Sequence, residues 1–415
     1  SSTTQRYFTL GATKAFEWGG NLSMSYLPSY QSTLDTTQYT LQAPPFTTYP
    51  AETTESARPY GGRLTATYTQ SLLKGFGRDI SNSGLIIARR NAQSADFTFQ
   101  KAIIDLVASI ETQYWDVVYN LKNFENKKLA LELAQKQLRE NKIRVEVGTM
   151  APIEIASAES QVAAREQEIL QAESDLANAK DALLRALYPA GERPSDLTPT
   201  DGPTLGRVQL SEADAQKMAM DRRVELKISR LSLENAQLSE QVAHNRLKPQ
   251  LDVALNYVSA ASSQKTYGDL NSDITGSKNP GYGATLTFAL PIQNRAAKGG
   301  LSKARADVRA GELGLKDQSL GIMLEVRSTL RSVESAEKRV VAAKKSREYK
   351  ELDFAAEQKK FENGMSTTFV VLSKQNELDA SRASELQAQI AYAKAVTAFE
   401  KAVGNLLEAR KLEVK

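Results

Sequence analysis

The chain contains no cysteine and only one histidine among its 415 residues, so the side chains that most often bind transition metals are almost absent. Without cysteine there can be neither a disulfide framework nor a thiolate metal site. The one histidine, His244, precedes Pro249 near the end of a helical stretch. Because a lone histidine is a poor ligand or base, we interpret it as a solvated helix residue. We therefore expect no metal site and no cofactor.

Long apolar runs and dense basic clusters are also missing. No run approaches ~18 apolar residues, so the sequence predicts no transmembrane helix. This does not exclude a membrane, because outer-membrane strands alternate in polarity and give a much weaker signal. The formal net charge of +4 is small for the length, and Lys and Arg form no compact block with interleaved aromatic residues. We therefore expect no nucleic-acid partner.

Sequence motifs of catalysis are absent too. The segment GFGRD (75–79) has two glycines, but it lacks a third in register and a preceding βαβ unit, so it does not indicate a nucleotide loop. No HExxH, GxSxG or GKS/T motif occurs. Acids and bases are spaced along helical stretches at i, i+3 and i+4, which is typical of solvated helix faces. We therefore predict no enzyme and no catalytic residue.

Two stretches rich in Thr, Ser, Gly and aromatic residues show period-2 alternation, which predicts β-strands with one apolar face. The expected strands are Arg6–Phe16, Asn21–Tyr30, Gly62–Leu72, 251–260 and 282–292, with a tight turn at Trp18-Gly19-Gly20 and a proline-rich long loop over 31–59. The aromatic residues suit the two interfaces of a membrane barrel. A soluble β-sandwich is the alternative, but it does not explain the rest of the chain.

The remaining sequence is long, poor in proline and rich in Ala, Glu, Gln, Lys and Leu. It predicts helices over Asn82–Val147, Ile153–Leu187, Glu212–Leu247, Arg295–Phe361 and Phe369–Glu408. Two of these run for about 65 residues, or about 100 Å, and must pack along their length. Apolar residues follow the 4-3 spacing of a coiled coil, but about half of the positions in that spacing are polar, for example Lys128 and Glu166. This favours helices that form a thin wall with one face in contact with water.

The two halves of the chain repeat one another. The segment VEVGTMAPIEIASAESQ from Val145 aligns with FENGMSTTFVVLSKQNE from Phe361, which places Gly148 over Gly364 at an offset of 216 residues. The strand at Leu64 aligns with the one at Ala284. In both halves the order of elements is strand, long helix, Gly turn and second helix. We infer a tandem duplication, which constrains the fold more than any local motif.

Five segments in this order carry a family resemblance: GRLTATYTQSLLKGFGRD (62–79), VGTMAPIEI (147–155), RRVELKISRLSLENAQLSEQVAHNRLKPQLDV (222–253), ALPIQNRAAKGGLSKARADV (289–308) and NGMSTTFVVL (363–372). Together they resemble the TolC-like outer membrane factor family, also called outer membrane efflux proteins. The resemblance implies an α+β membrane protein: a trimeric transmembrane β-barrel continued by a long α-helical coiled-coil barrel, built from a tandem strand–helix repeat.

The same resemblance implies function, location and partners. The protein would be the exit duct of a tripartite efflux or type I secretion system, in the outer membrane of a Gram-negative (diderm) bacterium and extending into the periplasm. Its expected partners are two further copies in a homotrimer, a periplasmic adaptor (membrane fusion) protein, an inner-membrane RND or ABC transporter, and outer-membrane lipid. A periplasmic coiled-coil scaffold or adaptor without a barrel is the alternative. The sequence does not identify the cargo.

Projected onto this chain, the family's plan divides it into seven segments. They are first barrel strands with a long extracellular loop (1–80), a first helical hairpin (81–188), an equatorial connector (189–211), a helix into the second half (212–250), a second β-hairpin (251–292), a second helical hairpin (293–400) and an equatorial C-terminal segment (401–415).

The resemblance also assigns site residues near the two Gly turns. The tip that docks the adaptor would comprise Gly148, Thr149, Met150, Gly364, Met365 and Ser366. The constriction would comprise Glu154, Phe361, Val370 and Ser373, with Asp379 and Lys374 next in line. The acids that the family often carries after the second glycine are replaced here by Val370, Val371, Leu372 and Ser373. We therefore expect a hydrophobic constriction rather than an acidic ring.

The order of the strands predicts residues upstream of Ser1. The strand Gly62–Leu72 must run inward because it feeds the long helix, so Asn21–Tyr30 runs outward and Arg6–Phe16 runs inward. A chain that enters from the periplasm would then need another outward strand and a helix ahead of Ser1. The alternative is that Arg6–Phe16 lies outside the sheet.

Overall fold

The computed structural model describes residues 2–37, 52–55, 60–188, 191, 194, 197–203, 206, 210–263, 266–276 and 280–412. These residues form two compact units. The sheet unit comprises Ser1–Gln93 and Leu231–Leu313, and the helical unit comprises Ser94–Arg230 and Gly314–Lys415. Most of the expected loop 31–59 and part of the connector 189–211 fall outside the described residues.

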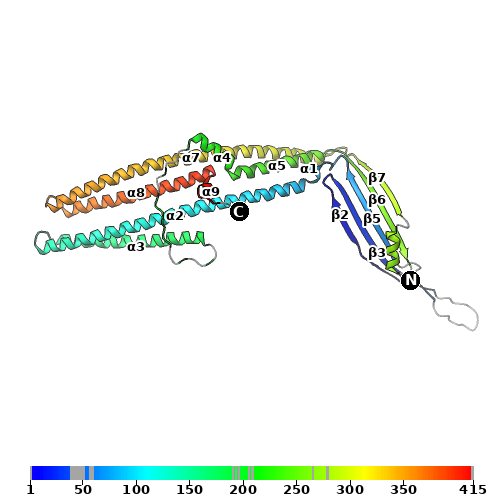
Figure 1. Ribbon diagram of the computed structural model, residues 1–415, viewed down its shortest axis with the longest axis horizontal. Coiled ribbons are helices and arrows are strands. Elements are labelled where there is room, and N and C mark those ends of the chain that lie inside the picture. The colour runs from blue at the N-terminus through cyan, green and yellow to red at the C-terminus, as the bar shows by residue number, and fades with distance from the viewer. Residues whose placement is uncertain are drawn as a thin grey trace, which may run out of the picture. The chain divides into compact units, whose positions relative to one another are not determined.

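The sheet unit is built on antiparallel strands in the order β1-β3-β5-β6-β7 (Figure 1). The long strands are β3 (Gly20–Thr37), β5 (Tyr60–Ser71), β6 (Gln250–Ser263) and β7 (Pro280–Ala289). On the far side of β3 from β5, β1 (Ser2–Tyr7) and β2 (Leu10–Ala15) both pair with it. On the same side as β5, β4 (Glu52–Glu55) pairs with the last residues of β3. Most of the expected strand Arg6–Phe16 lies in the sheet, in β1 and β2, and not outside it as in the alternative. One expectation is corrected: β3 continues to Thr37, where a loop was expected.

A proline explains why β1 and β2 are separate. Both pair with β3 in one continuous register, from Ser2 opposite Leu34 to Ala15 opposite Asn21. At the break, the Phe8 N–H donates to the Pro28 carbonyl at 3.4 Å. Because Pro28 has no N–H to donate in return, the ladder loses a bond at this point. The two strands are therefore one strand with a local interruption.

The sheet has one apolar face and one polar face. Ala66 and Tyr68 of β5 lie opposite Tyr257 and Leu255 of β6, whereas the intervening residues are mostly threonines. A short helix that the sequence reading missed, α6 (Tyr267–Thr275), covers one end of the apolar face with its buried Leu270 and Ile274. A Cβ at Gly62 would come within 2.6 Å of Ile274 Cδ1, so glycine makes room for this helix.

The GFGRD segment forms the passage from β5 into the helices. Gly75 and Gly77 adopt positive φ values of 86° and 116°, which glycine adopts at little cost, and α1 (Arg78–Ser81) follows. The Gly75 N–H donates to Asn245 Oδ1 at 2.6 Å. The β2–β3 turn lies against the same passage, since Glu17 pairs with Arg78 at 2.5 Å. The motif therefore has a structural role.

The helical unit consists mainly of two long hairpins (Figure 1). The first is α2 (Ser83–Glu146) with α3 (Ile153–Leu187), and the second is α7 (Arg295–Glu362) with α8 (Thr368–Val403); the first residues of α2 and α7 belong to the sheet unit. Ion pairs link the partners within each hairpin, such as Lys127–Glu168 at 2.9 Å in the first and Lys350–Glu377 in the second. No helix in the described ranges is both long and apolar enough to cross a membrane.

Two expected helices are interrupted. The stretch 212–247 is divided into α4 (Glu212–Arg222) and α5 (Val224–Asn245), because Arg223 is extended and its side chain pairs with Glu225 and Glu325, each at 3.0 Å. The last stretch ends at Val403, where Gly404 caps α8 in the left-handed region (φ 82°), before α9 (Leu406–Ala409). The main core lies where α4, the first turn of α5, α7 and α8 meet, around Ala219, Leu226, Val326 and Phe399.

Candidate functional site

The turn between α2 and α3 is a Schellman motif, in which a left-handed residue closes two backward hydrogen bonds at a helix end. Gly148 has a φ of 76°, and its N–H donates to the Val145 carbonyl at 2.9 Å. The Thr149 N–H donates to the Arg144 carbonyl, also at 2.9 Å. The motif satisfies carbonyls that would otherwise lack partners at the end of α2.

The turn between α7 and α8 has the same construction at the same repeat position. Gly364 also has a φ of 76°, and its N–H donates to the Phe361 carbonyl at 3.0 Å. The Met365 N–H donates to the Lys360 carbonyl at 2.9 Å. Both glycines therefore adopt the left-handed geometry expected of them, and the offset of 216 residues relates the two turns bond for bond.

Three highly exposed apolar side chains of the turns, those of Val147, Ile153 and Phe369, were not among the predicted tip residues. Ile153 and Phe369, which are equivalent in the repeat, begin α3 and α8 and are 72% and 80% exposed. Val147 and Met365 are 72% and 71% exposed. The signal that could have found Ile153 and Phe369 was the repeat alignment, since both halves keep an apolar residue five positions after the glycine.

The predicted tip residues divide into exposed and structural ones. Met365 is exposed and Met150 is half-buried. The Thr149 hydroxyl donates to the Arg144 carbonyl at 2.9 Å, so it reinforces the first turn. The Ser366 hydroxyl donates to Glu357 Oε1 at 2.5 Å, and Lys360 pairs with the same carboxylate at 3.0 Å. These contacts, Ser366 first, lower the pKa of Glu357.

The predicted gate residues are all buried or half-buried. Phe361 is buried, with the Arg144 guanidinium 4.7 Å from its ring centre, so it joins the ends of α7 and α2. Glu154 is half-buried in the first turn of α3. Val370 and Ser373 are half-buried, on either side of the buried Val371. The structure thus brings Phe361 of one hairpin to Arg144 of the other.

A buried ion cluster joins α3 of the first hairpin to α8 of the second, farther along these helices from the turns. Arg165 of α3 is 6% exposed and pairs with Glu168 at 2.9 Å and with Asp379 of α8 at 3.3 Å, and it also donates to the Asn376 side-chain oxygen. Burial raises the pKa of Asp379, although Arg165 opposes the shift. Lys374 pairs with Asp353 at 3.2 Å, which raises its pKa. Asp379 and Lys374 are therefore engaged in pairs between helices.

In the described part of the chain, no three His, Asp or Glu side chains gather closely enough to hold a metal ion. The outer membrane efflux protein family matches residues 55–187 and 216–405, well over half of the chain. The chain belongs to the outer membrane efflux protein family. No match was found among curated proteins.

Solved outer-membrane channels share the fold of this efflux family member. The outer-membrane channel OprN is 15% identical, with a TM-score of 0.71 over 96% of this chain and 81% of its own. The outer membrane protein VceC from Vibrio cholerae is 16% identical, with a TM-score of 0.67 over 94% and 87%. The open-state MtrE channel of Neisseria gonorrhoeae is 16% identical, with a TM-score of 0.67 over 91% and 80%.

Family membership confirms four of the inferences from the sequence: the family, the strand–helix α+β fold, the outer-membrane location with an extension into the periplasm, and the role of an exit duct in efflux. The family is one of channels rather than enzymes.

Proposed function

We propose that the protein is the trimeric outer-membrane exit duct of a tripartite system, and that its two Gly turns dock a periplasmic adaptor that is served by an RND or ABC pump. The observation that carries the docking proposal is the duplicated Schellman turn with its matched exposed apolar residues, Ile153 and Phe369. Cargo selection would lie with the pump, as the family resemblance implies.

The trimer is supported by the edges of the sheet. The strand order ends at β7 on one side and at β1 and β2 on the other, and the described residues of the chain do not close it. An open edge leaves N–H and C=O groups without partners, which lipid does not tolerate. Other copies of the chain would satisfy these groups, and the family resemblance gives their number as three.

The docking surface is supported by exposure at fixed geometry. Val147, Ile153, Met365 and Phe369 expose apolar side chains on turns whose backbones are held by two hydrogen bonds each. Apolar residues on a rigid support bind a partner at low entropic cost. Thr149, Met150 and Ser366 flank these residues and would complete the surface.

Cross-linking tests this surface directly, because the chain contains no cysteine to interfere. Single cysteines at Met365 and Phe369, carrying a short photoreactive group, should capture the adaptor in cells. Ile153→Ser with Phe369→Ser should abolish both the capture and export, while the trimer persists. Leu170→Ser is the matched control, since Leu170 is also highly exposed on α3 but lies away from the turn. Normal export by the double variant would refute the docking proposal.

A hydrophobic constriction at the same end of the hairpins is the second part of the proposal. Phe361 would brace it through Arg144, and Glu154, Val370 and Ser373 would line it or support its lining. Val370→Ala with Phe361→Ala should raise the single-channel conductance in a planar bilayer, because both truncations widen an apolar passage. An unchanged conductance would place the constriction elsewhere.

A further inference from the structure

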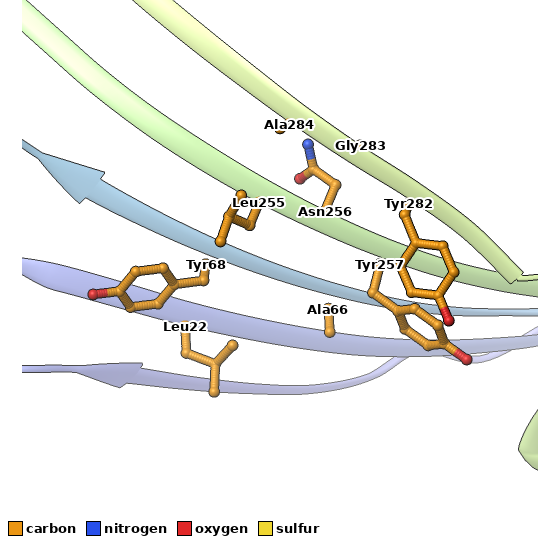
Figure 2. Close-up of a pocket in the computed structure, with 9 residues that line it drawn as sticks. All are labelled: Leu22, Ala66, Tyr68, Leu255, Asn256, Tyr257, Tyr282, Gly283 and Ala284. Carbon is orange, nitrogen blue, oxygen red and sulfur yellow. The ribbon is translucent and has the colours of Figure 1, made fainter.

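An open groove crosses the middle of the apolar face of the sheet. It has a volume of about 520 Å³, and strands β3, β5, β6 and β7 all contribute to it. Figure 2 shows Leu22 and Tyr68 at one end, Tyr257 and Tyr282 at the other, and Ala66 and Ala284 between them. The size falls within the range of about 300–1,000 Å³ that is usual for small-molecule sites.

Both ends of the groove are held in place. At one end the Tyr68 hydroxyl donates to Gln70 Oε1 at 2.8 Å and accepts from Trp18 Nε1 at 3.0 Å. At the other end the rings of Tyr257 and Tyr282 lie 5.5 Å apart. Between these walls lie Ala66 and Ala284, whose small side chains leave space, and Leu255, the cross-strand partner of Ala284. The groove is therefore a fixed depression of the sheet rather than a gap between mobile side chains.

A cation lies at the Leu22 end of this groove. Lys14 of β2 is the cross-strand partner of Leu22, so both side chains are on the apolar face. Lys14 is exposed, and its Nζ lies 5.4 Å from the ring centre of Phe16. This is the end of the sheet at which β5 passes into α1, which is the periplasmic end in an outer membrane efflux protein.

A lysine beside aromatic rings at the edge of an apolar face is typical of a membrane interface, where the ammonium reaches a lipid phosphate and the stem stays in the apolar zone. At the opposite end, α6 covers the apolar face and presents exposed Asp269 and Asn271 outward. Lipid chains are thereby excluded from that end. The groove lies between the level of Lys14 and α6, and exposed apolar residues of the same face, Leu286 and Phe288, continue beyond it on β7.

We propose that this groove is a binding site for one phospholipid of the periplasmic leaflet, with its phosphate at Lys14 and an acyl chain running from Leu22 across Ala66 toward Tyr257 and Tyr282. An acyl chain is the occupant that suits the groove, because its walls are apolar and the face lies in the outer membrane. The site depends on the membrane location of the family and not on adaptor docking, so the two proposals fail independently.

Native mass spectrometry of the detergent-purified channel tests the proposal. The channel is first reconstituted in vesicles of phosphatidylethanolamine and phosphatidylglycerol, then extracted, and the retained phospholipid is counted per chain. Ala66→Leu with Ala284→Leu fills the groove and should reduce retention to background. Ala12→Leu is the matched control, because Ala12 lies on the same face and at the same level as Ala66, each opposite Met24, but outside the groove. It should retain lipid like the wild type.

Lys14→Gln should weaken retention by about fivefold, the effect of losing one lysine near a lipid surface. If the double variant fails to assemble, Ala284→Leu alone on the exposed edge strand β7 gives the same readout. Equal retention by the groove-filling and control variants would overturn the site. Retention of lipid A in preference to phospholipid in a parallel reconstitution would overturn its assignment to the periplasmic leaflet.

Discussion

The two helical hairpins share a backbone but not their side chains. Their turns have the same φ at glycine and the same pair of hydrogen bonds. The residues at equivalent positions of the repeat nevertheless differ: Thr149 aligns with Met365, Met150 with Ser366 and Glu154 with Val370. A Schellman motif requires only a left-handed residue at one position, so glycine persists while its neighbours diverge. The glycine is therefore required by the backbone of each turn, whereas the neighbouring side chains are free to differ between the two tips.

The hairpins also differ at a contact between them. Arg165 corresponds to Ser381 in the second half, and Asp379 corresponds to Ala163 in the first, so the buried ion cluster has no counterpart in the repeat. A duplicated hairpin that packs against its own copy cannot keep both surfaces identical when one must supply a cation and the other an anion. The two copies therefore differ at this contact.

Removing the cation from this cluster should have the largest effect. Arg165→Leu leaves Asp379 buried without its partner, and breaking a buried pair costs about 3–5 kcal/mol. We expect a lower midpoint in thermal unfolding of the purified channel. Ser381→Ala at the equivalent position should change the free energy of unfolding by less than about 1 kcal/mol. A small effect of Arg165→Leu would show that the cluster is solvated in the assembled channel.

The same variant has a defined pH dependence. Burial raises the pKa of Asp379 above its unfolded value, so the folded state holds this proton more tightly than the unfolded state. Stability from this group therefore falls as pH rises through the interval between the two pKa values, and recovers as pH falls. The destabilisation by Arg165→Leu should accordingly shrink in mild acid, when Asp379 is neutral.

The turns should respond alike to the loss of glycine. Gly148→Val and Gly364→Val should each cost about 1–2 kcal/mol, because a β-branched residue is strained at φ 76°. A Cβ meets no atom within 4 Å at either glycine, so the cost comes from the backbone and not from a clash. Both variants should lose export while the trimer stays intact.

Gly321→Ala in α7 is the matched control, since its added Cβ also meets nothing within 4 Å and its φ is not positive. It should stabilise the helix by about 0.5–1 kcal/mol. Wild-type export by both valine variants, or unequal losses between them, would contradict the equivalence of the two turns.

The backbone of this protein was largely predictable from local sequence, whereas its tertiary contacts were not. The bounds Ile153–Leu187 were read from proline-free apolar spacing, and the two turns from aligned glycines. The break at Arg223 was missed because no proline or glycine marks it, and it depends on Glu325, far along the chain. α6 did carry a local signal, since Thr266 and Asp269 cap it, but the surrounding strand pattern obscured it.

The site was predictable in position and not in detail. The resemblance indicated both turns and named Phe361 as lining or bracing a constriction, but it did not reveal that Phe361 is buried against Arg144. That contact joins residues of different hairpins, so no spacing in the sequence could reveal it. Ile153 and Phe369 were not among the predicted tip residues, although they occupy equivalent positions in the repeat.

The smallest expected effect is a difference in acid response between the two tips. Glu357 corresponds to Asn141 in the first hairpin, so only the second tip has a carboxylate at this position. The hydrogen bond from Ser366, and then the one from Lys360, hold the pKa of Glu357 below its usual value. A carboxylate with a lowered pKa stabilises the folded tip above its unfolded pKa, and that contribution is lost as pH falls through the folded pKa.

Ser366→Ala removes the larger of these two contributions, so the second tip should loosen at a higher pH than in the wild type. An environment-sensitive dye on a single cysteine at Met365 should report this as an upward shift of the acid midpoint. The same dye at Val147, which is about as exposed on the first tip, should show no shift between Ser366→Ala and its parent. An equal shift of the acid midpoint at Met365 and at Val147 would mean that the two tips loosen together when Glu357 is protonated. No shift at either would remove Glu357 as the titrating group.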